Sequence, residues 1–157
     1  GAWCGTWASE MSEFANSIKA FEPNATNFKC LERNAGRYPN INPFVYALGD
    51  KPGFLSMTSD DFTQALRIEE SQGKIPVKTI DEFGWTDVDL IKIDVEGYEM
   101  KVLEGAEETL TNTNLLMIEL NNNTKKYGSS NQQIEGYLKE LGFHEMINIW
   151  PDKVYCR

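Results

Sequence analysis

The chain has 157 residues, of which 41% are hydrophobic and 25% are charged, and its formal net charge is −9. This length and composition are typical of one globular domain, and they exclude a disordered tail, a collagen-like chain and a disulfide-rich scaffold. The acidic balance without a basic stripe argues against a partner that is nucleic acid or an anionic membrane, and no apolar run reaches the roughly 18 residues of a membrane span.

The cysteines and the N-terminal residues predict a compartment. Cys4, Cys30 and Cys156 are odd in number and far apart, and no C-x-x-C motif is present. This usage is typical of reduced thiols in a reducing compartment. The first residues lack the basic and apolar regions of a signal peptide. We therefore expect a cytoplasmic protein.

Strand-like and helix-like patterns alternate along the chain, which predicts an α/β fold with a mostly parallel sheet and helices on both faces. The elements expected in the first half are a helix over 6–16, a strand over 17–21, a helix capped by Asn24 and ended by Gly36, a strand over 44–48 and an edge strand over 54–57. Residues 58–73 are the least regular, and we expect a mobile excursion with a brief helix around Phe62, Ala65 and Leu66.

The second half contains the strongest pattern, the nearly continuous apolar run 88–95, which is typical of a central parallel strand. The other elements expected here are a strand over 77–80 leading into a turn at 81–83, a helix opened by Gly97, a strand over 115–120, a helix over 134–141 stopped by Gly142, and a hairpin of 143–149 and 153–156 turned at Pro151.

Ligands of open α/β sheets bind beyond the carboxyl ends of the strands. The residues that the expected strands and the first loop deliver there are acids, amides and small residues, with no Lys or Arg: Gly1–Trp7, Glu22, Ala47, Leu48, Asp50, Asp94, Glu96, Glu119 and Asn121. We expect the functional site among them.

Glu22 and the glycine loop point to a nucleoside-containing cofactor. A carboxylate just past a strand can accept hydrogen bonds from both hydroxyls of a ribose. A dinucleotide would need G-x-G-x-x-G for its pyrophosphate, whereas Gly1 and Gly5 are spaced G-x-x-x-G. S-adenosylmethionine has no phosphate and carries a positive sulfonium, so an acidic site suits it better. Alternatively, Glu22 is a strand-end carboxylate in water.

The other acids also have simpler interpretations. Asp94 can cap the helix that begins near Gly97, and Glu96 is favoured by the helix dipole. Glu119 ends a buried strand and needs a partner. Asp94, Glu96 and Glu119 could ligate a hard cation, but they lack an ordered spacing and we expect no metal.

Two further residues that could carry chemistry have structural interpretations. His144, the only histidine, is expected at the surface or in a structural role. Cys4 is expected to be a small buried loop residue rather than a nucleophile, because no histidine is near it in sequence.

Four segments together resemble the FkbM-type methyltransferase family over nearly the whole chain. They are Gly1–Gly5, Ala20–Asn24, Ala47–Asp50 and Val88–Gly97, the last followed by Glu99, Val102, Leu103, Gly105 and Ala106. The resemblance implies a class I, Rossmann-like methyltransferase fold with parallel strands and a final antiparallel hairpin. It also implies transfer of a methyl group from S-adenosylmethionine, usually to an oxygen of a sugar or secondary metabolite.

The resemblance assigns roles to individual residues. It places the loop of Gly1, Ala2, Trp3, Cys4 and Gly5 by the methionine part of the cofactor, Glu22 with Pro23 at the ribose, and Ala47 with Leu48 near the adenine. Asp94 would face both cofactor and acceptor, and Asp94, Glu96 and Glu119 are the catalytic candidates. The acceptor would be a small molecule or glycan with a hydroxyl, bound by the polar segments 58–73 and 121–130.

The chain departs from the family at its start. Members carry a buried strand and an acid before the glycine loop, whereas this sequence begins at Gly1-Ala2. We therefore expect a single methyltransferase domain over 1–157 that is N-terminally truncated and lacks the first central strand. Alternatively, neighbouring strands close the gap left by the missing strand, or a second copy of the chain fills it. A homo-oligomer is therefore one of the alternatives. The rival functions are a nicotinamide-dinucleotide oxidoreductase and a non-catalytic Rossmann-like binding module.

Overall fold

A computed structural model describes residues 1–59, 66–69 and 73–157. The chain divides into two compact units, an N-terminal unit of residues 1–47 and 53–77 and a C-terminal unit of residues 48–52 and 78–157. The single domain over 1–157 and its truncation stay predictions.

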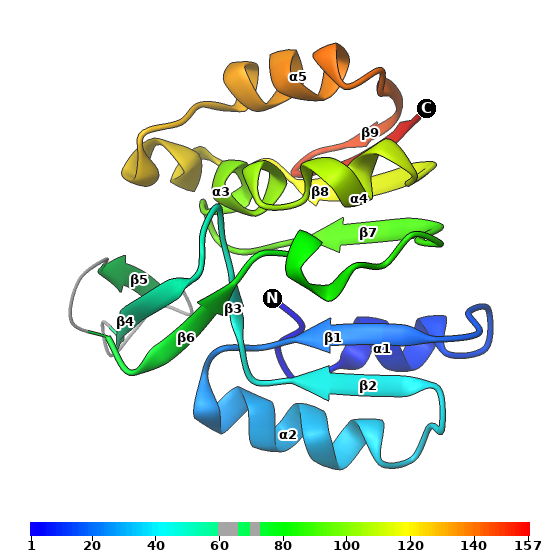
Figure 1. The fold of residues 1–157 in the computed structure, drawn as a ribbon, viewed down its shortest axis with the longest axis vertical. Helices are drawn as coiled ribbons and strands as arrows, with labels where there is room; N and C mark the ends of the chain where they lie inside the picture. The colour runs from blue at the N-terminus through cyan, green and yellow to red at the C-terminus, as the bar shows by residue number, and fades with distance from the viewer. Residues whose placement is uncertain (60–65, 70–72) are drawn as a thin grey trace. The chain divides into compact units, whose positions relative to one another are not determined.

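The N-terminal unit is built on a pair of parallel strands flanked by two helices (Figure 1). These elements are α1 (Thr6–Met11), β1 (Ile18–Phe21), α2 (Ala25–Ala35) and β2 (Ile41–Phe44). Their apolar faces meet in one buried cluster of Ala8, Ala20, Leu31, Ala35 and Ile41. The helical spacing of residues 6–16 and the strand at 17–21 are thus confirmed, although α1 is shorter than predicted.

The boundaries of α2 follow from its capping residues. The Asn24 side chain accepts hydrogen bonds from the backbone N–H groups of Thr26 and Asn27, at 2.9 and 3.0 Å, which satisfies two donors that the first helical turn leaves open. At the other end Gly36 is the C-cap, as predicted.

The strand predicted at 44–48 is wrong: β2 ends at Phe44 and β3 covers only Ala47–Leu48. The observed β2 begins at Ile41 and includes Pro43, a residue that is unfavourable inside a sheet unless its nitrogen faces away from the paired strand. The backbone bonds from Ile18 to Asn40 and from Glu22 to Phe44 show that even-numbered residues of this segment face β1. The nitrogen of Pro43 therefore faces the other edge, where its missing N–H costs no bond to β1.

A second sheet of this unit corrects the prediction for residues 54–57. The strand β4 (Gly53–Ser59) pairs with β6 (Ile75–Lys78) on one side and β5 (Leu66–Glu69) on the other, both antiparallel, so β4 is not an edge strand. The sheet order is β3-β6-β4-β5. Leu66 begins β5 rather than belonging to a helix, and the rest of the predicted excursion, 60–65 and 70–72, lies outside the described residues.

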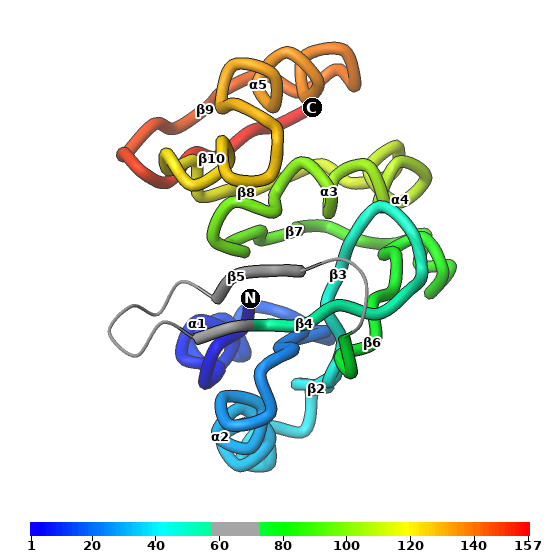
Figure 2. Tube along the Cα trace, turned by 90° about the vertical axis from the view of Figure 1, so that its left-hand side faces the viewer, coloured from blue at the N-terminus to red at the C-terminus, as the bar shows by residue number. Residues whose placement is uncertain are grey.

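The C-terminal unit contains a four-stranded sheet in the order β7-β8-β10-β9 (Figure 2). Its elements are η1 (Asp81–Phe83), β7 (Leu90–Ile93), α3 (Glu99–Glu104), α4 (Glu107–Thr111), β8 (Leu115–Glu119), η2 (Asn122–Tyr127), α5 (Asn131–Glu140), β9 (His144–Ile149) and β10 (Asp152–Cys156). β7 and β8 are parallel, and β10 is antiparallel to both β8 and β9. The predicted closing hairpin is confirmed.

The run 88–95 contains a strand, but not a central one within the described residues. β7 is shorter than predicted and lies at the end of its sheet, where β8 is its paired neighbour, while β1 belongs to the separate pair with β2. Of its four residues only Ile93 is buried, and the other three are half-buried.

The core of the C-terminal unit joins the helices to this sheet. Helix faces predicted from periodicity are buried, including Val102 on α3, Ala106 at the start of α4, and Ile134 with Leu138 on α5. The helix opened by Gly97 is interrupted between α3 and α4 at Gly105, and a Cβ at Gly105 would lie 1.9 Å from the carbonyl oxygen of Gly49. This close approach of two backbones explains the interruption.

Within the described part of the chain, none of the helices has both the length and the apolar character required to cross a bilayer.

Candidate functional site

Glu22 lies at the end of β1 and joins that strand to the glycine loop. The residue is only 4% exposed, and the two oxygens of its carboxylate accept hydrogen bonds from the backbone N–H groups of Trp3 (2.8 Å) and Asn24 (2.9 Å). The interpretation of Glu22 as a carboxylate in open water is therefore wrong. Each oxygen has a second lone pair, so the carboxylate can still accept one more hydrogen bond on each side.

The loop before α1 is a tight backbone turn. Trp3 has φ +50° and Gly5 has φ +82°, and a Cβ at Gly5 would lie 2.7 Å from the Leu31 side chain. The N–H of Ala2 donates to Phe21 and that of Gly5 to Ala2, both at 2.8 Å. With Trp3 bonded to Glu22, three of the loop's N–H groups already have acceptors, so few donors are left for a pyrophosphate.

A cluster of ionisable side chains occupies the carboxyl ends of β7 and β8. The ammonium group of Lys92 lies 2.9 Å from Oδ2 of Asp94. Burial would raise the pKa of Asp94, but the hydrogen bond and charge of Lys92 outweigh it, so the pKa is lowered. The pKa of Glu119 is raised, mainly by burial and by the charges of Asp94 and Glu96, and Glu119 shares a side-chain hydrogen bond with Asp94.

When their surroundings shift the pKa values of two neighbouring carboxyl groups in opposite directions, the two groups can take opposite roles in proton transfer. At neutral pH Asp94 is ionised and can accept a proton. Glu119 holds its proton more tightly than an ordinary glutamate. Asp94 can therefore accept a proton from a bound hydroxyl, as a weaker base than an ordinary aspartate because its pKa is lowered, not raised as a general base would need, with Glu119 hydrogen-bonded beside it.

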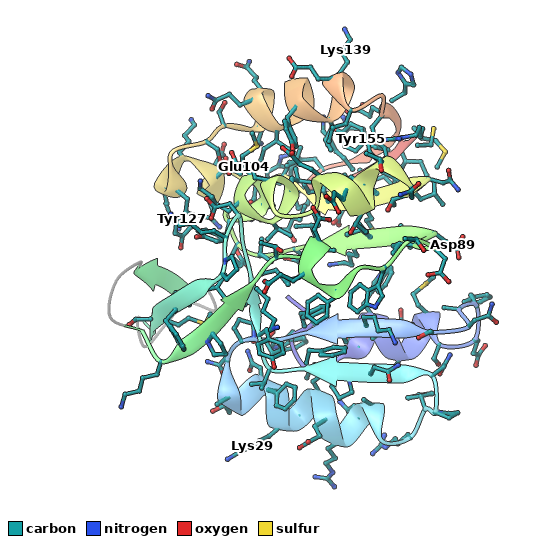
Figure 3. The ribbon with its side chains drawn as sticks, in the orientation of Figure 1. Lys29, Asp89, Glu104, Tyr127, Lys139 and Tyr155 are labelled. Atoms are coloured by element: carbon teal, nitrogen blue, oxygen red, sulfur yellow. The ribbon has the colours of Figure 1, made fainter. Side chains whose placement is uncertain are left out.

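Amide side chains extend this cluster to Glu96. Asn121 donates to Glu119 at 3.1 Å, the backbone N–H of Asn123 donates to the Asn121 side chain at 2.8 Å, and Asn123 in turn donates to Glu96 at 3.0 Å. The ring of Tyr127, labelled in Figure 3 at the end of η2, packs edge-on against Tyr98 with 5.4 Å between centroids. These contacts hold the turn after β8 against the loop after β7.

The structure does not support Asp94 as a helix cap. Tyr98 precedes the first residue of α3, and no side chain caps that position, while Asp94 is bonded to Lys92. The backbone between them turns through Glu96 at φ +57° and Gly97 at φ +112°.

The predicted site residues thus fall into two groups. The N-terminal unit brings Gly1–Gly5, Glu22 and Pro23 together, and the C-terminal unit brings Asp94, Glu96 and Glu119 together. Ala47 is buried and Leu48 packs against the core of the C-terminal unit.

The remaining candidates are placed as follows. Trp3 is 50% exposed, Cys4 is half-buried and His144 is exposed. Among the residues described, no three acidic, histidine or cysteine side chains are arranged to bind a metal ion.

Sequence reasoning missed Lys92, because it considered only residues beyond the strand ends. The signal was available, since residues i and i+2 of a strand point to the same face, which places Lys92 beside Asp94. It also missed Asn123, whose contact with Glu96 spans 27 positions and follows only from the turn that Asn121 caps.

Comparison with known proteins decides the family. The model of the methyltransferase FkbM domain matches residues 3–145. The chain belongs to the FkbM methyltransferase family. This FkbM chain is also 31% identical over 128 residues to the hexuronic acid methyltransferase AglP of Haloferax volcanii, a match that covers 76% of the chain and 53% of AglP. The FkbM chain therefore spans about half the length of this curated relative.

Solved structures confirm the fold class. The FkbM methyltransferase of Methylobacillus flagellatus superposes with a TM-score of 0.71 at 18% identity, over 100% of this chain and 42% of that one. An rRNA methylase of Streptococcus thermophilus superposes with a TM-score of 0.50 at 12% identity, over 99% of this chain and 80% of that one. The FkbM chain thus has the mixed α/β fold of class I methyltransferases, as its sequence predicts.

Proposed function

We propose that this FkbM chain carries an S-adenosylmethionine-dependent O-methyltransferase activity whose acceptor is a hydroxyl group of a hexuronic acid sugar. The observation that carries the proposal is the Lys92–Asp94–Glu119 cluster at the ends of β7 and β8, in a chain of this family. It provides an ionised carboxylate, which can accept a proton from a hydroxyl.

The N-terminal unit fits S-adenosylmethionine better than a dinucleotide. The buried Glu22 carboxylate has free lone pairs for the two ribose hydroxyls, and its negative charge disfavours a pyrophosphate at the same loop. Three N–H groups of that loop are already bonded within the protein. When bound, S-adenosylmethionine supplies a methyl group made electrophilic by the sulfonium.

The residues of the C-terminal unit prepare the acceptor. Asp94 accepts the hydroxyl proton as the oxygen becomes nucleophilic, and Lys92 keeps Asp94 ionised before that step. Glu119, whose pKa is raised, hydrogen-bonds to Asp94 and fixes its orientation. Holding the hydroxyl beside an oriented base converts a bimolecular proton transfer into an effectively unimolecular one, which lowers the activation barrier.

A hexuronic acid is favoured over a neutral sugar by the charges on η2. Lys125 and Lys126 are exposed, and no ion pair involves either of them among the described residues. They lie within three residues of Asn123, which bonds to Glu96. An acceptor whose hydroxyl is at Asp94 would therefore find positive charge for its carboxylate in an otherwise acidic chain. The relative AglP is named for hexuronic acid.

The test compares the methyl glycoside of glucuronic acid with that of glucose, using S-adenosylmethionine labelled in the methyl group. We expect an alkali-stable methyl ether on the glucuronide, and a kcat/KM about fivefold higher than for the glucoside, the size of one partly exposed ion pair worth about 1 kcal/mol.

Replacing both Lys125 and Lys126 by glutamine should abolish the preference for the glucuronide without lowering turnover of the glucoside. The matched control is K139Q, which removes one exposed lysine from α5 and should keep the preference. An alkali-labile methyl ester would show that the carboxylate is methylated instead of a hydroxyl, and equal rates on both glycosides would contradict the role of Lys125 and Lys126.

A further inference from the structure

Glu99, the first residue of α3, is a completely buried acid outside the cluster described above. Its side chain is 0% exposed. Its Oε1 atom accepts hydrogen bonds from the backbone N–H groups of Gly97 (2.9 Å) and Val95 (3.3 Å). Its Oε2 atom is buried without a hydrogen-bond partner among the described residues. Burying a carboxyl group with one oxygen left without a hydrogen-bond partner is unfavourable, so simple core filling would be served better by an apolar side chain.

The two N–H groups that donate hydrogen bonds to Glu99 belong to a strained turn. Glu96 (φ +57°) and Gly97 (φ +112°) both have left-handed backbones, and a residue with a Cβ adopts this region only when its surroundings enforce it. The turn has no room to relax toward η2, because a Cβ at Gly97 would lie 2.6 Å from the carbonyl oxygen of Asn123. The chain leaves β7 here before α3 begins, so neither sheet nor helix bonds the N–H groups of Val95 and Gly97.

This turn carries the groups that the proposed reaction needs. Asp94 directly precedes Val95, and Glu96 lies between the two residues whose N–H groups Glu99 accepts. The hydrogen bonds of Asp94 to Lys92 and of Glu96 to Asn123 require the turn to keep its conformation. If the N–H groups of Val95 and Gly97 had no internal acceptor, they would be satisfied by turning outward to water, which would displace both carboxylates.

We propose that Glu99 is a positioning residue that, through Oε1, holds the Val95–Gly97 turn in the left-handed conformation that places Asp94 and Glu96. Glu99 does not touch the substrate, because it is fully buried. Its effect on turnover rests on the proposed methyltransferase activity, whereas its effect on the turn does not.

The protonation state of Glu99 determines which substitution preserves this role. Burial raises the pKa of Glu99, against the N–H groups of Gly97, Glu99 and Val95, which lower it. A carboxyl group accepts through one oxygen whether or not the other is protonated. Glutamine keeps that accepting oxygen and alanine removes it, so the two substitutions separate loss of the acceptor from loss of the charge.

The experiment uses E99A, E99Q and the control L103A, which truncates another fully buried side chain of α3. Amide hydrogen exchange by NMR is read at Gly97 and Val95, and steady-state kinetics are read with S-adenosylmethionine and methyl glucuronide. We expect E99A to speed exchange at both amides and to lower kcat by about 100-fold, the cost of displacing a catalytic group by about 1 Å, with KM changed far less. E99Q should recover most of kcat and of the exchange protection.

The control distinguishes positioning from packing. L103A should lower stability at least as much as E99A, yet keep the exchange protection of Gly97 and Val95 relative to the rest of α3, with kcat within about threefold of the unmodified protein, measured where both are folded. Unchanged exchange at Gly97 in E99A, or an equal loss of kcat in L103A, would overturn the proposal. If the unmodified protein does not methylate the glucuronide, the proposed function fails, while the exchange measurement still decides the role of Glu99.

Discussion

Replacing Asp94 with alanine is expected to lower kcat for methyl transfer by about 10²–10⁴-fold, the usual contribution of a general base. The reason is that Asp94 is the carboxylate kept ionised by Lys92, 2.9 Å away, whereas the pKa of its neighbour Glu119 is raised. Binding of S-adenosylmethionine, measured by calorimetry, should change little. Turnover of methyl glucuronide by D94A at the rate of the unmodified protein would exclude Asp94 as the base.

The dependence on pH gives the same assignment a second readout. The pKa of Asp94 is lowered by Lys92 against the effect of burial, so the base form persists to lower pH than for an ordinary aspartate, and kcat/KM should fall only in the acid range. K92M removes the charge that stabilises ionised Asp94, so the fall of kcat/KM at low pH (the acid limb of the profile) should move to higher pH. K92R should leave the acid limb nearly in place. Because Asp94 and Glu119 share a hydrogen bond, the observed midpoint belongs to the pair.

A matched control for K92M is K153M, which removes a lysine paired with Glu135 and Glu145 on the same unit. K153M should leave the acid limb unchanged, because neither of those carboxylates belongs to the Asp94 cluster. A shift of equal size in K153M and K92M would show that the profile follows the net charge of the protein rather than the local ion pair.

The second large effect concerns stability: G105A should reduce the free energy of unfolding of the C-terminal unit by about 3 kcal/mol or more, at the upper end of overpacking substitutions. A Cβ at Gly105 would lie 1.9 Å from the carbonyl oxygen and 2.9 Å from the carbonyl carbon of Gly49, and 3.3 Å from Cβ of Thr79. The first two are backbone atoms, so no side-chain rotation can relieve the clash. Chemical denaturation followed by circular dichroism measures the change.

The matched control is G136A in α5, an exposed helical position where a Cβ would meet nothing within 4 Å. Alanine at this site should stabilise the protein by about 0.5–1 kcal/mol, since glycine is the poorer helix former. A G105A protein as stable as the unmodified one would mean that the two backbones at Gly49 and Gly105 do not approach as the structure has them.

Local chemistry explains which elements could be predicted from the sequence. The start of α2 follows from Asn24 accepting the first free N–H groups of the helix, and the face of α5 follows from the spacing of Ile134 and Leu138. The hairpin of β9 and β10 follows from two short strands with a turn at Pro151. In each case the signal lies within a few residues of the structure that it determines.

The failures depend on pairing between distant segments. Nothing near β4 indicates that it has a partner on each side, since β5 and β6 follow it in the chain and close on it afterwards. Pro43 lies inside β2, where proline is unfavourable, yet its nitrogen faces the edge of β2 away from β1. The run 88–95 indicated a strand correctly, but its apolar pattern does not specify how many strands pair with it, and within the described residues β7 pairs with β8.

The sequence predicted which acidic residues lie at the candidate site, but not the hydrogen-bond partners and the burial of those residues. Glu22, Asp94, Glu96 and Glu119 follow from the rule that functional groups gather at the carboxyl ends of strands. The bonds from Trp3 to Glu22 and from Asn123 to Glu96 arise from the folded loops and span 19 and 27 positions. The opposite pKa shifts of Asp94 and Glu119 depend on Lys92, which the i, i+2 spacing of a strand could have indicated, and on burial, which follows only from the fold.

The most direct measurement of the central claim is a calorimetric titration of S-adenosylmethionine and, separately, of NAD into the unmodified protein, E22A and N24A. We expect S-adenosylmethionine to bind the unmodified protein and NAD not to bind. E22A should weaken binding at least about tenfold, or 1.4 kcal/mol, for the loss of charge-assisted bonds to the ribose. N24A keeps the backbone N–H that donates to Glu22 and should keep the affinity for S-adenosylmethionine. Undiminished binding to E22A, or binding of NAD in place of S-adenosylmethionine, would contradict the account.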